Sequence, residues 1–262
     1  MIINATCELA FQTHVPVPAV LMLHPHSGPR QWIMREEYAI IPHSPVSEYT
    51  DGFGNICQRV VAPAGNFTVR SSCTADVADE IDVDFDAEFV PAEKVPDNVL
   101  QYLVPSRYCL SDLMHQEALS IVGDLTPGYR QVEAIRSWIE QNVEYRYGSS
   151  NASTTALDTW QNRSGVCRDF AHLGMTLCRT LNIPARMVVG YLKDLEPMDL
   201  HAWFEAWVGG RWYVFDATQK TPRGNRITVA YGRDAADVAL VTQFGPLQLV
   251  SMKVTVEAPP VF

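Results

Sequence analysis

The hydrophobic pattern of the chain changes its period once, and this change limits the folds that are open to it. Up to about residue 105, short runs rich in Val, Ile, Thr, Phe and Tyr alternate with turn signals such as "DGFGN" (51–55) and "APAGN" (62–66). From residue 129, apolar residues recur at steps of three and four, the spacing of an amphipathic helix. The pattern predicts an α+β chain, with a β-sandwich-like N-terminal domain over 1–110 and a second domain over 111–262.

The second domain contains two predicted helices and several predicted strands. Thr126 as N-cap and Pro127 at the first helical position predict a helix that runs to about Val143. A second helix starts near Ser164–Gly165 and ends before Pro184. Strand-like runs follow and extend to the C-terminal end: "ARMVVGY", "HAWFEAWV", "RWYVFDA", "NRITVAYG" and "PLQLVSMKVTVEA".

The charge and the cysteines limit the partners and the compartment. A formal net charge of −10 disfavours nucleic acid and anionic membrane surfaces as partners. The sequence has no apolar stretch of membrane-spanning length, and its start lacks a signal-peptide pattern, so we expect a cytoplasmic protein. The six cysteines lack CxxC spacing, and in a reducing compartment we expect free thiols.

Cys167 stands at the start of the second predicted helix, directly after small, turn-prone residues. Unpaired backbone N–H groups and the helix macrodipole stabilise an anion in the first helical turn. A thiolate is favoured there, so Cys167 is the candidate nucleophile. The other five cysteines are interpreted as small buried apolar residues.

The run "HAWFEAWVGGRWYVFDAT" predicts a hairpin with a two-residue Gly-Gly turn at 209–210. This turn fixes the register and sets Trp203 opposite Asp216. His201 then lies diagonal to Asp216 on the same face, where the two side chains can meet. A thiol nucleophile, a histidine general base and an orienting carboxylate form the triad that acyl transfer uses.

Three other features allow different assignments. Glu205 lies on the same strand face as His201 but about 13 Å along the strand, so it is interpreted as a structural or binding residue. His172 comes five residues after Cys167 on one helix and is turned well away from it. The two histidines of "HPHSGP" (24–29) lie in a loop without a third and fourth ligand nearby, so no metal site is predicted.

The ordered set of motifs resembles the transglutaminase-like superfamily of papain-fold cysteine enzymes, in particular its bacterial cysteine protease-like branch. The matching stretches are "SGVCRDFAHLGMTLCRTLNIPARMVVGY", "HAWFEAWVGGRWYVFDAT" and, more weakly, "ITVAYGRDAADV". The resemblance implies Cys167, His201 and Asp216 as the catalytic triad. It also implies a papain-like core in which the cysteine helix packs on a β-sheet. The chain departs from the family pattern at "DATQ", where Asp-Pro-Thr is more usual, and at Leu200, where a small residue is common.

An acyl-transfer site also needs an oxyanion hole and a substrate cleft. The backbone N–H of Cys167 is one expected oxyanion donor, because the helix start directs it at the site. Trp160 and Gln161 are the alternative candidates for the second donor. Tyr191 is either a cleft residue or a core tyrosine, and Trp203 is the other cleft candidate.

These observations predict a thiol hydrolase, a cysteine protease or amidase that cleaves an amide or isopeptide bond of a peptide or amide substrate through a thioester. A protein-glutamine transglutaminase is the alternative enzyme, because the hydrolase and the transglutaminase share the acyl-enzyme step. The sequence shows no acidic loop with calcium-site spacing, which favours hydrolysis without a cofactor. A catalytically inactive peptide-binding module and a zinc site formed by the three triad residues are the alternatives from other classes.

Overall fold

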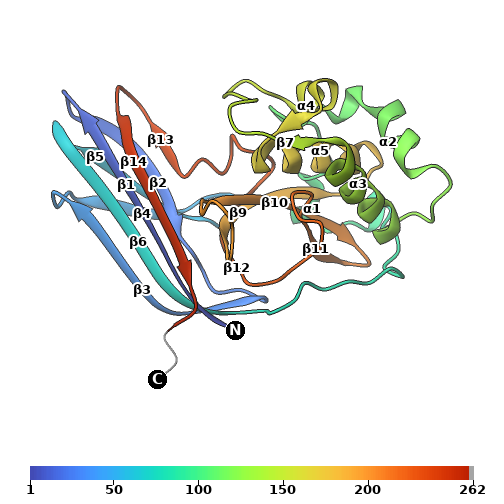
Figure 1. The fold of residues 1–262 in the computed structure, drawn as a ribbon, viewed down its shortest axis with the longest axis horizontal. Coiled ribbons are helices and arrows are strands. Elements are labelled where there is room, and N and C mark those ends of the chain that lie inside the picture. Colours follow the sequence, from blue (N-terminus) through green and yellow to red (C-terminus); the bar gives the residue numbers. More distant parts are fainter. Residues whose placement is uncertain (260–262) are drawn as a thin grey trace.

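The computed structural model describes residues 1–259 and contains a β-sandwich beside a mixed unit of helices and strands (Figure 1). One sheet of the sandwich has the strand order β14-β1-β6-β3, and the other has the order β13-β2-β5-β4. The α+β class and the β-sandwich-like N-terminal region are therefore confirmed. The sandwich strands are β1 (Ile2–Thr13), β2 (Val17–His24), β3 (Gln31–Ile41), β4 (Val46–Thr50), β5 (Ile56–Ala62), β6 (Gly65–Val77), β13 (Val241–Gln243) and β14 (Gln248–Glu257).

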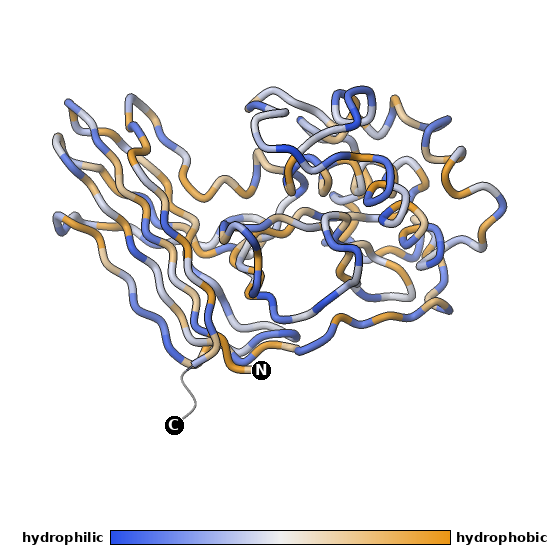
Figure 2. Tube along the Cα trace, viewed as in Figure 1, coloured by the Kyte–Doolittle hydropathy of each residue, from blue (hydrophilic) through white to orange (hydrophobic). Residues whose placement is uncertain are grey.

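Alternation of apolar and polar residues produces these strands and buries one face of each sheet. Along β1, every second side chain from Ile3 to Phe11 is buried, and the residues between them are more exposed. The same alternation is visible along the sandwich strands in Figure 2. The predicted turns at 51–55 and 62–66 connect β4 to β5 and β5 to β6. A cluster of buried apolar residues includes members of both units, so the sandwich and the mixed unit pack on each other.

Two strands from the C-terminal end belong to the sandwich. β14 pairs antiparallel with β1, with Val254 opposite Cys7, and β13 pairs with β2. The sequence analysis had placed the strand "PLQLVSMKVTVEA", which is β14, in the second domain, and that assignment was wrong. It had predicted no strand at β13. Without β14 and β13, β1 and β2 would be open sheet edges, and pairing satisfies the backbone groups of such edges. The division at residue 110 stays a prediction.

The mixed unit has a sheet of order β11-β10-β9-β12 with helices on one side (Figure 1). Helix α5 packs against β10 so closely that a Cβ on Gly174 would lie 2.4 Å from the Phe204 ring. The cysteine helix therefore packs on an antiparallel sheet, as expected. The elements of the mixed unit are η1 (Ala92–Lys94), α1 (Asp97–Leu100), η2 (Ser111–Leu113), α2 (His115–Val122), α3 (Tyr129–Asn142), β7 (Glu144–Tyr145), α4 (Ala156–Asn162), β8 (Ser164–Gly165), α5 (Cys167–Thr180), β9 (Ala185–Leu192), β10 (His201–Val208), β11 (Arg211–Phe215) and β12 (Arg226–Gly232).

Helix α3 begins two residues later than predicted. Its N-cap is Gly128, at φ 125°, and no side chain caps it. The reason is tertiary pairing: the Phe89 N–H donates to the Pro127 carbonyl at 3.2 Å, and the Tyr129 N–H donates to the Ala87 carbonyl at 3.0 Å. The backbone at 127–129 is thus bound to a neighbouring segment before the helix starts. No helix within residues 1–259 is long and apolar enough to cross a membrane.

Candidate active site

The β10–β11 hairpin has the register that its Gly-Gly turn predicts. Gly209 and Gly210 both have positive φ, at 57° and 82°, which is the backbone that a two-residue hairpin turn requires. Val208 pairs with Arg211, and the ladder continues to Phe204 opposite Phe215. His201, at the start of β10, and Asp216, directly after β11, therefore come to the same end of the hairpin.

His201 and Asp216 form a buried pair at that end. The Nε2 atom of His201 lies 2.7 Å from Oδ2 of Asp216, and each residue is only 3% exposed. Thr218 donates to Oδ1 of Asp216 from its backbone N–H at 3.0 Å and from its hydroxyl at 2.7 Å. Nη1 of Arg226 lies 2.9 Å from Oδ2. The carboxylate is thus held in one position by three residues.

These contacts set the protonation states of the pair. Burial alone would raise the pKa of Asp216, but the charges of His201 and Arg226 and the hydrogen bonds hold it well below its ordinary value. Burial likewise acts to lower the pKa of His201, but Asp216, and to a lesser extent Cys167, raise it to about 9. His201 is therefore an imidazolium at neutral pH, paired with an ionised Asp216.

Cys167 is the first residue of α5 and lies beside His201. It is partly exposed, whereas the other five cysteines, all of them free, are buried. Its thiol contributes a hydrogen bond to the rise in the pKa of His201. Because Asp216 occupies Nε2, the ring nitrogen left for the thiol is Nδ1. A nucleophile, a base and an orienting carboxylate are thus brought together from α5, β10 and the end of β11.

The residues around the helix start explain the "SGVC" stretch. The fully buried Asp169 accepts the Val166 N–H through Oδ2 at 2.9 Å and pairs with Arg168 at 2.8 Å. A Cβ at position 165 would lie 2.7 Å from the Cβ of Asp169, so only glycine fits there. The carboxylate satisfies an N–H at the helix start, and Gly165 leaves it room, which fixes the position of Cys167.

Tyr145 is a polar neighbour of Cys167 that the sequence analysis missed. Its strand β7 pairs in parallel with β8, which places Tyr145 opposite Gly165. Burial and the charge of Cys167 raise the pKa of the Tyr145 phenol, and a hydrogen bond from the Cys167 backbone opposes that rise. A phenol is therefore available beside the thiol and the first helical N–H.

The candidate oxyanion and cleft residues differ in their burial and in their contacts. The Trp160 ring stacks on Trp138 at 4.5 Å, and Gln161 is exposed. Their role as second oxyanion donor stays a prediction. Tyr191 is 1% exposed and packs in the core, where burial raises its pKa well above the ordinary value. Of the two alternatives for Tyr191, the structure thus places this side chain in the core. Trp203 is also buried, with its ring 6.1 Å from that of His201, and it lines a cavity.

His172 and Glu205, the two other titratable residues considered for the site, are bound to partners outside the triad. His172 is fully buried, accepts the Ala235 N–H on Nε2 at 3.1 Å and stacks on Tyr108, and burial lowers its pKa to about 4. Glu205 is 3% exposed and is bound by Arg30 and Arg186. Neither residue therefore contacts the His201–Asp216 pair through these hydrogen bonds and ion pairs. In residues 1–259, no group of three or more His, Cys, Asp or Glu side chains is arranged to hold a metal ion.

Comparisons with known proteins agree with this fold. The model of the transglutaminase-like superfamily matches residues 116–217. An uncharacterized protein of Mycobacterium leprae is 30% identical over 232 residues, which cover 83% of this chain and 82% of that protein. An uncharacterized protein of Mycobacterium tuberculosis (strain H37Rv) is 27% identical over 260 residues, covering 82% and 77%. The crystal structure of a "Putative Cysteine Protease" from Cytophaga hutchinsonii is similar over 100% of this chain and 92% of that one, with a TM-score of 0.91 and 36% identity.

Proposed function

The chain belongs to the transglutaminase-like superfamily, and we propose that it is a thiol hydrolase that cleaves an amide or isopeptide bond. The observation that carries the proposal is the buried His201–Asp216 pair, at 2.7 Å, beside a thiol at the first residue of a helix. This is the combination of nucleophile, base and orienting group that acyl transfer requires. The likeness to the Cytophaga hutchinsonii protein, whose name is "Putative Cysteine Protease", supports the same reaction class.

Acylation begins from the thiolate–imidazolium pair. The Cys167 sulfur attacks the carbonyl carbon of the substrate, and the carbonyl oxygen becomes an oxyanion beside the N–H at the start of α5. The C–N bond then breaks, and His201 gives its proton to the leaving amine. The products of this half-reaction are a free amine and a thioester on Cys167. Asp216 holds the imidazole in position and stabilises its charge in the starting state.

Water completes the cycle in the proposed reaction. The neutral His201 left by acylation takes a proton from water, which attacks the thioester, and the carboxylic acid leaves with the thiolate restored. A primary amine in place of water would make the chain a protein-glutamine transglutaminase, with the same thioester. We propose a peptide or amide substrate, no cofactor and a cytoplasmic location, as the composition and the free thiols favour.

The proposal is tested with p-nitrophenyl acetate, which acylates a reactive thiol and releases a coloured product. We expect a burst of p-nitrophenol, an acetyl group on Cys167 in the mass spectrum, and release of acetate to water. The Cys167→Ala variant should lose all three signals. Cys57→Ala, which removes a buried thiol, is the matched control and should keep them.

The outcomes separate the candidate functions. Acetyl transfer to an added primary amine that outpaces release to water would favour the transglutaminase. The absence of any acetyl group on Cys167 in a folded protein would rule out the acyl-enzyme and leave the binding module as the explanation.

A further inference from the structure

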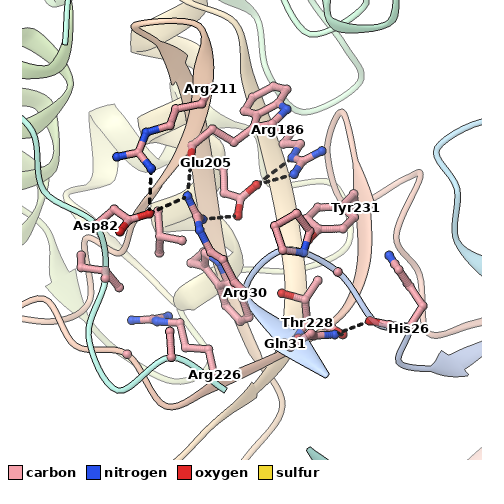
Figure 3. Close-up of a pocket in the computed structure, with 18 of the residues that line it drawn as sticks. His26, Arg30, Gln31, Asp82, Arg186, Glu205, Arg211, Arg226, Thr228 and Tyr231 are labelled. Atoms are coloured by element: carbon pink, nitrogen blue, oxygen red, sulfur yellow. Dashed lines mark hydrogen bonds and ion pairs between the residues drawn. The ribbon is translucent and has the colours of Figure 1, made fainter. Parts of the chain in front are cut away.

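A cavity of about 700 Å³ lies on the face of the β9–β12 sheet that is opposite helix α5 (Figure 3). Along β10, Phe204 faces α5, whereas Trp203, Glu205 and Trp207 line the cavity. The opposite wall comes from the loop over 26–31 that precedes β3 and from the segment over 78–82. The cavity therefore lies between the sandwich and the mixed unit, and its volume suits a small molecule.

The cavity wall carries several charged side chains, in a chain whose net charge is −10. Four arginines line it, against three carboxylates: Arg30, Arg186, Arg211 and Arg226 against Glu80, Asp82 and Glu205. Glu205 is shared by two of the arginines, at 2.6 Å from Nη2 of Arg186 and 3.0 Å from Nη1 of Arg30, and Figure 3 shows this network. These ion pairs rigidify the wall. Arg226, the fourth arginine, is paired through Nη1 with Asp216, which lies outside the lining residues.

Buried donors on the same wall have no acceptor. The indole N–H of Trp203, which is 2% exposed, and that of Trp207 find no hydrogen-bond partner among residues 1–259. Within the same range, Nη2 of Arg226 also lacks one, and this side chain is 7% exposed. Leaving buried donors unpaired costs free energy, so a ligand that brings acceptor oxygens would be stabilised here.

Aromatic surfaces supply the remaining chemistry of the cavity. The Arg186 guanidinium lies between the rings of Trp212 and Tyr231, with its carbon 4.2 Å and 3.8 Å from their centroids. Together with Trp203, these rings give the cavity flat apolar walls next to the unpaired donors. The wall thus combines aromatic surfaces with unpaired donors.

We propose that this cavity binds a small organic carboxylate with an aromatic body. The carboxylate accepts hydrogen bonds from Trp203 and Arg226, and the aromatic body packs on the neighbouring rings. Binding here does not need the Cys167 thiol. The triad residues Cys167, His201 and Asp216 do not line the cavity, although Arg226 contacts Asp216 at 2.9 Å.

Isothermal titration calorimetry of the full chain tests the proposal with three carboxylates, phenylacetate, indole-3-acetate and cinnamate, and with their primary amides. We expect at least one acid to bind, with its amide at least tenfold weaker. Trp203→Phe keeps an aromatic ring and removes the N–H, so it should lower the affinity for the acid by about tenfold or more. Trp32→Phe, at a residue that is 65% exposed, is the matched control and should leave the affinity unchanged.

The titrations are repeated with Cys167→Ala to keep this proposal separate from the proposed hydrolase. Binding that survives in Cys167→Ala supports the cavity even if no acyl-enzyme ever forms. Binding that disappears there would assign the ligand to the thiol site and overturn the proposal. The proposal would also be overturned if acid and amide bind with equal affinity, or if Trp203→Phe leaves the affinity unchanged. It would be overturned as well if none of the three acids binds.

Discussion

Replacing Asp216 by asparagine tests the electrostatic role of the His201–Asp216 pair most directly. The substitution keeps the shape of the side chain and removes its charge. In the wild type, the pKa of His201 is raised from 6.5 to about 9 although burial acts to lower it. That rise corresponds to about 3 kcal/mol in favour of the imidazolium. Without the carboxylate charge, burial dominates and the neutral ring is favoured.

The loss of the imidazolium form of His201 in this variant can be measured through the reactivity of Cys167. The equilibrium between the thiolate–imidazolium pair and the neutral pair should shift toward the neutral pair by a factor on the order of 100. We therefore expect the alkylation of Cys167 by iodoacetamide at pH 7 to slow at least tenfold. The rate is measured by mass spectrometry of the peptide that contains Cys167. The buried thiols of Cys7 and Cys73, whose pKa values burial raises to about 12, are slow internal references in the same sample.

A matched variant separates charge at the site from charge elsewhere. Asp86→Asn removes a carboxylate whose side chain is 94% exposed, and it should leave the alkylation rate unchanged. Circular dichroism checks that Asp216→Asn keeps the fold, since Arg226 loses its partner in this variant. An unchanged alkylation rate in folded Asp216→Asn would refute the argument that Asp216 controls the protonation of His201.

Two further predictions concern the pH dependence of the unfolding free energy and the role of Tyr145 as an oxyanion donor. Because the pKa of His201 is higher in the folded than in the unfolded chain, its contribution to stability is complete below pH 6.5 and is lost as the pH rises through about 9. The unfolding free energy from urea titrations should fall by up to about 3 kcal/mol across this window, and a similar fall in His201→Gln would contradict the assignment. Tyr145→Phe should slow acylation by p-nitrophenyl acetate roughly tenfold or more if the phenol is an oxyanion donor. It should not slow alkylation by iodoacetamide, which forms no oxyanion, and equal slowing of both reactions would show a general effect on the thiol.

The hairpin and the cysteine helix could be predicted because their signals are local. A two-residue Gly-Gly turn allows one register, and the period of two along a strand then determines which side chains share a face. His201 and Asp216 meet for this reason, although 15 residues separate them. The start of α5 was similarly visible, because the small, turn-prone residues Ser164 and Gly165 precede an apolar run with helical spacing.

The features that were missed depend on contacts between distant segments. Tyr145 reaches Cys167 through a strand of two residues, which is too short to leave a periodic pattern. Glu205 was placed correctly on the face of His201, but its partner Arg30 lies 175 residues away in the sequence. The cavity that Glu205 and Arg30 line has no sequence motif, because its walls come from many separate segments between residues 26 and 231.

The strand pairing makes the mixed unit an insertion in the sandwich. The chain leaves the sandwich after β6 and returns to it with β13 and β14, so the mixed unit is connected to the sandwich at both of its ends. Gln31, from the start of β3, also pairs with the backbone of Thr228 in β12, donating at 2.9 Å and accepting at 2.7 Å. A side chain of the sandwich thus substitutes for a neighbouring strand at the edge of the sheet that carries His201. The position of the cavity wall relative to the triad is therefore determined by both units together, and the sandwich is part of the architecture of the site.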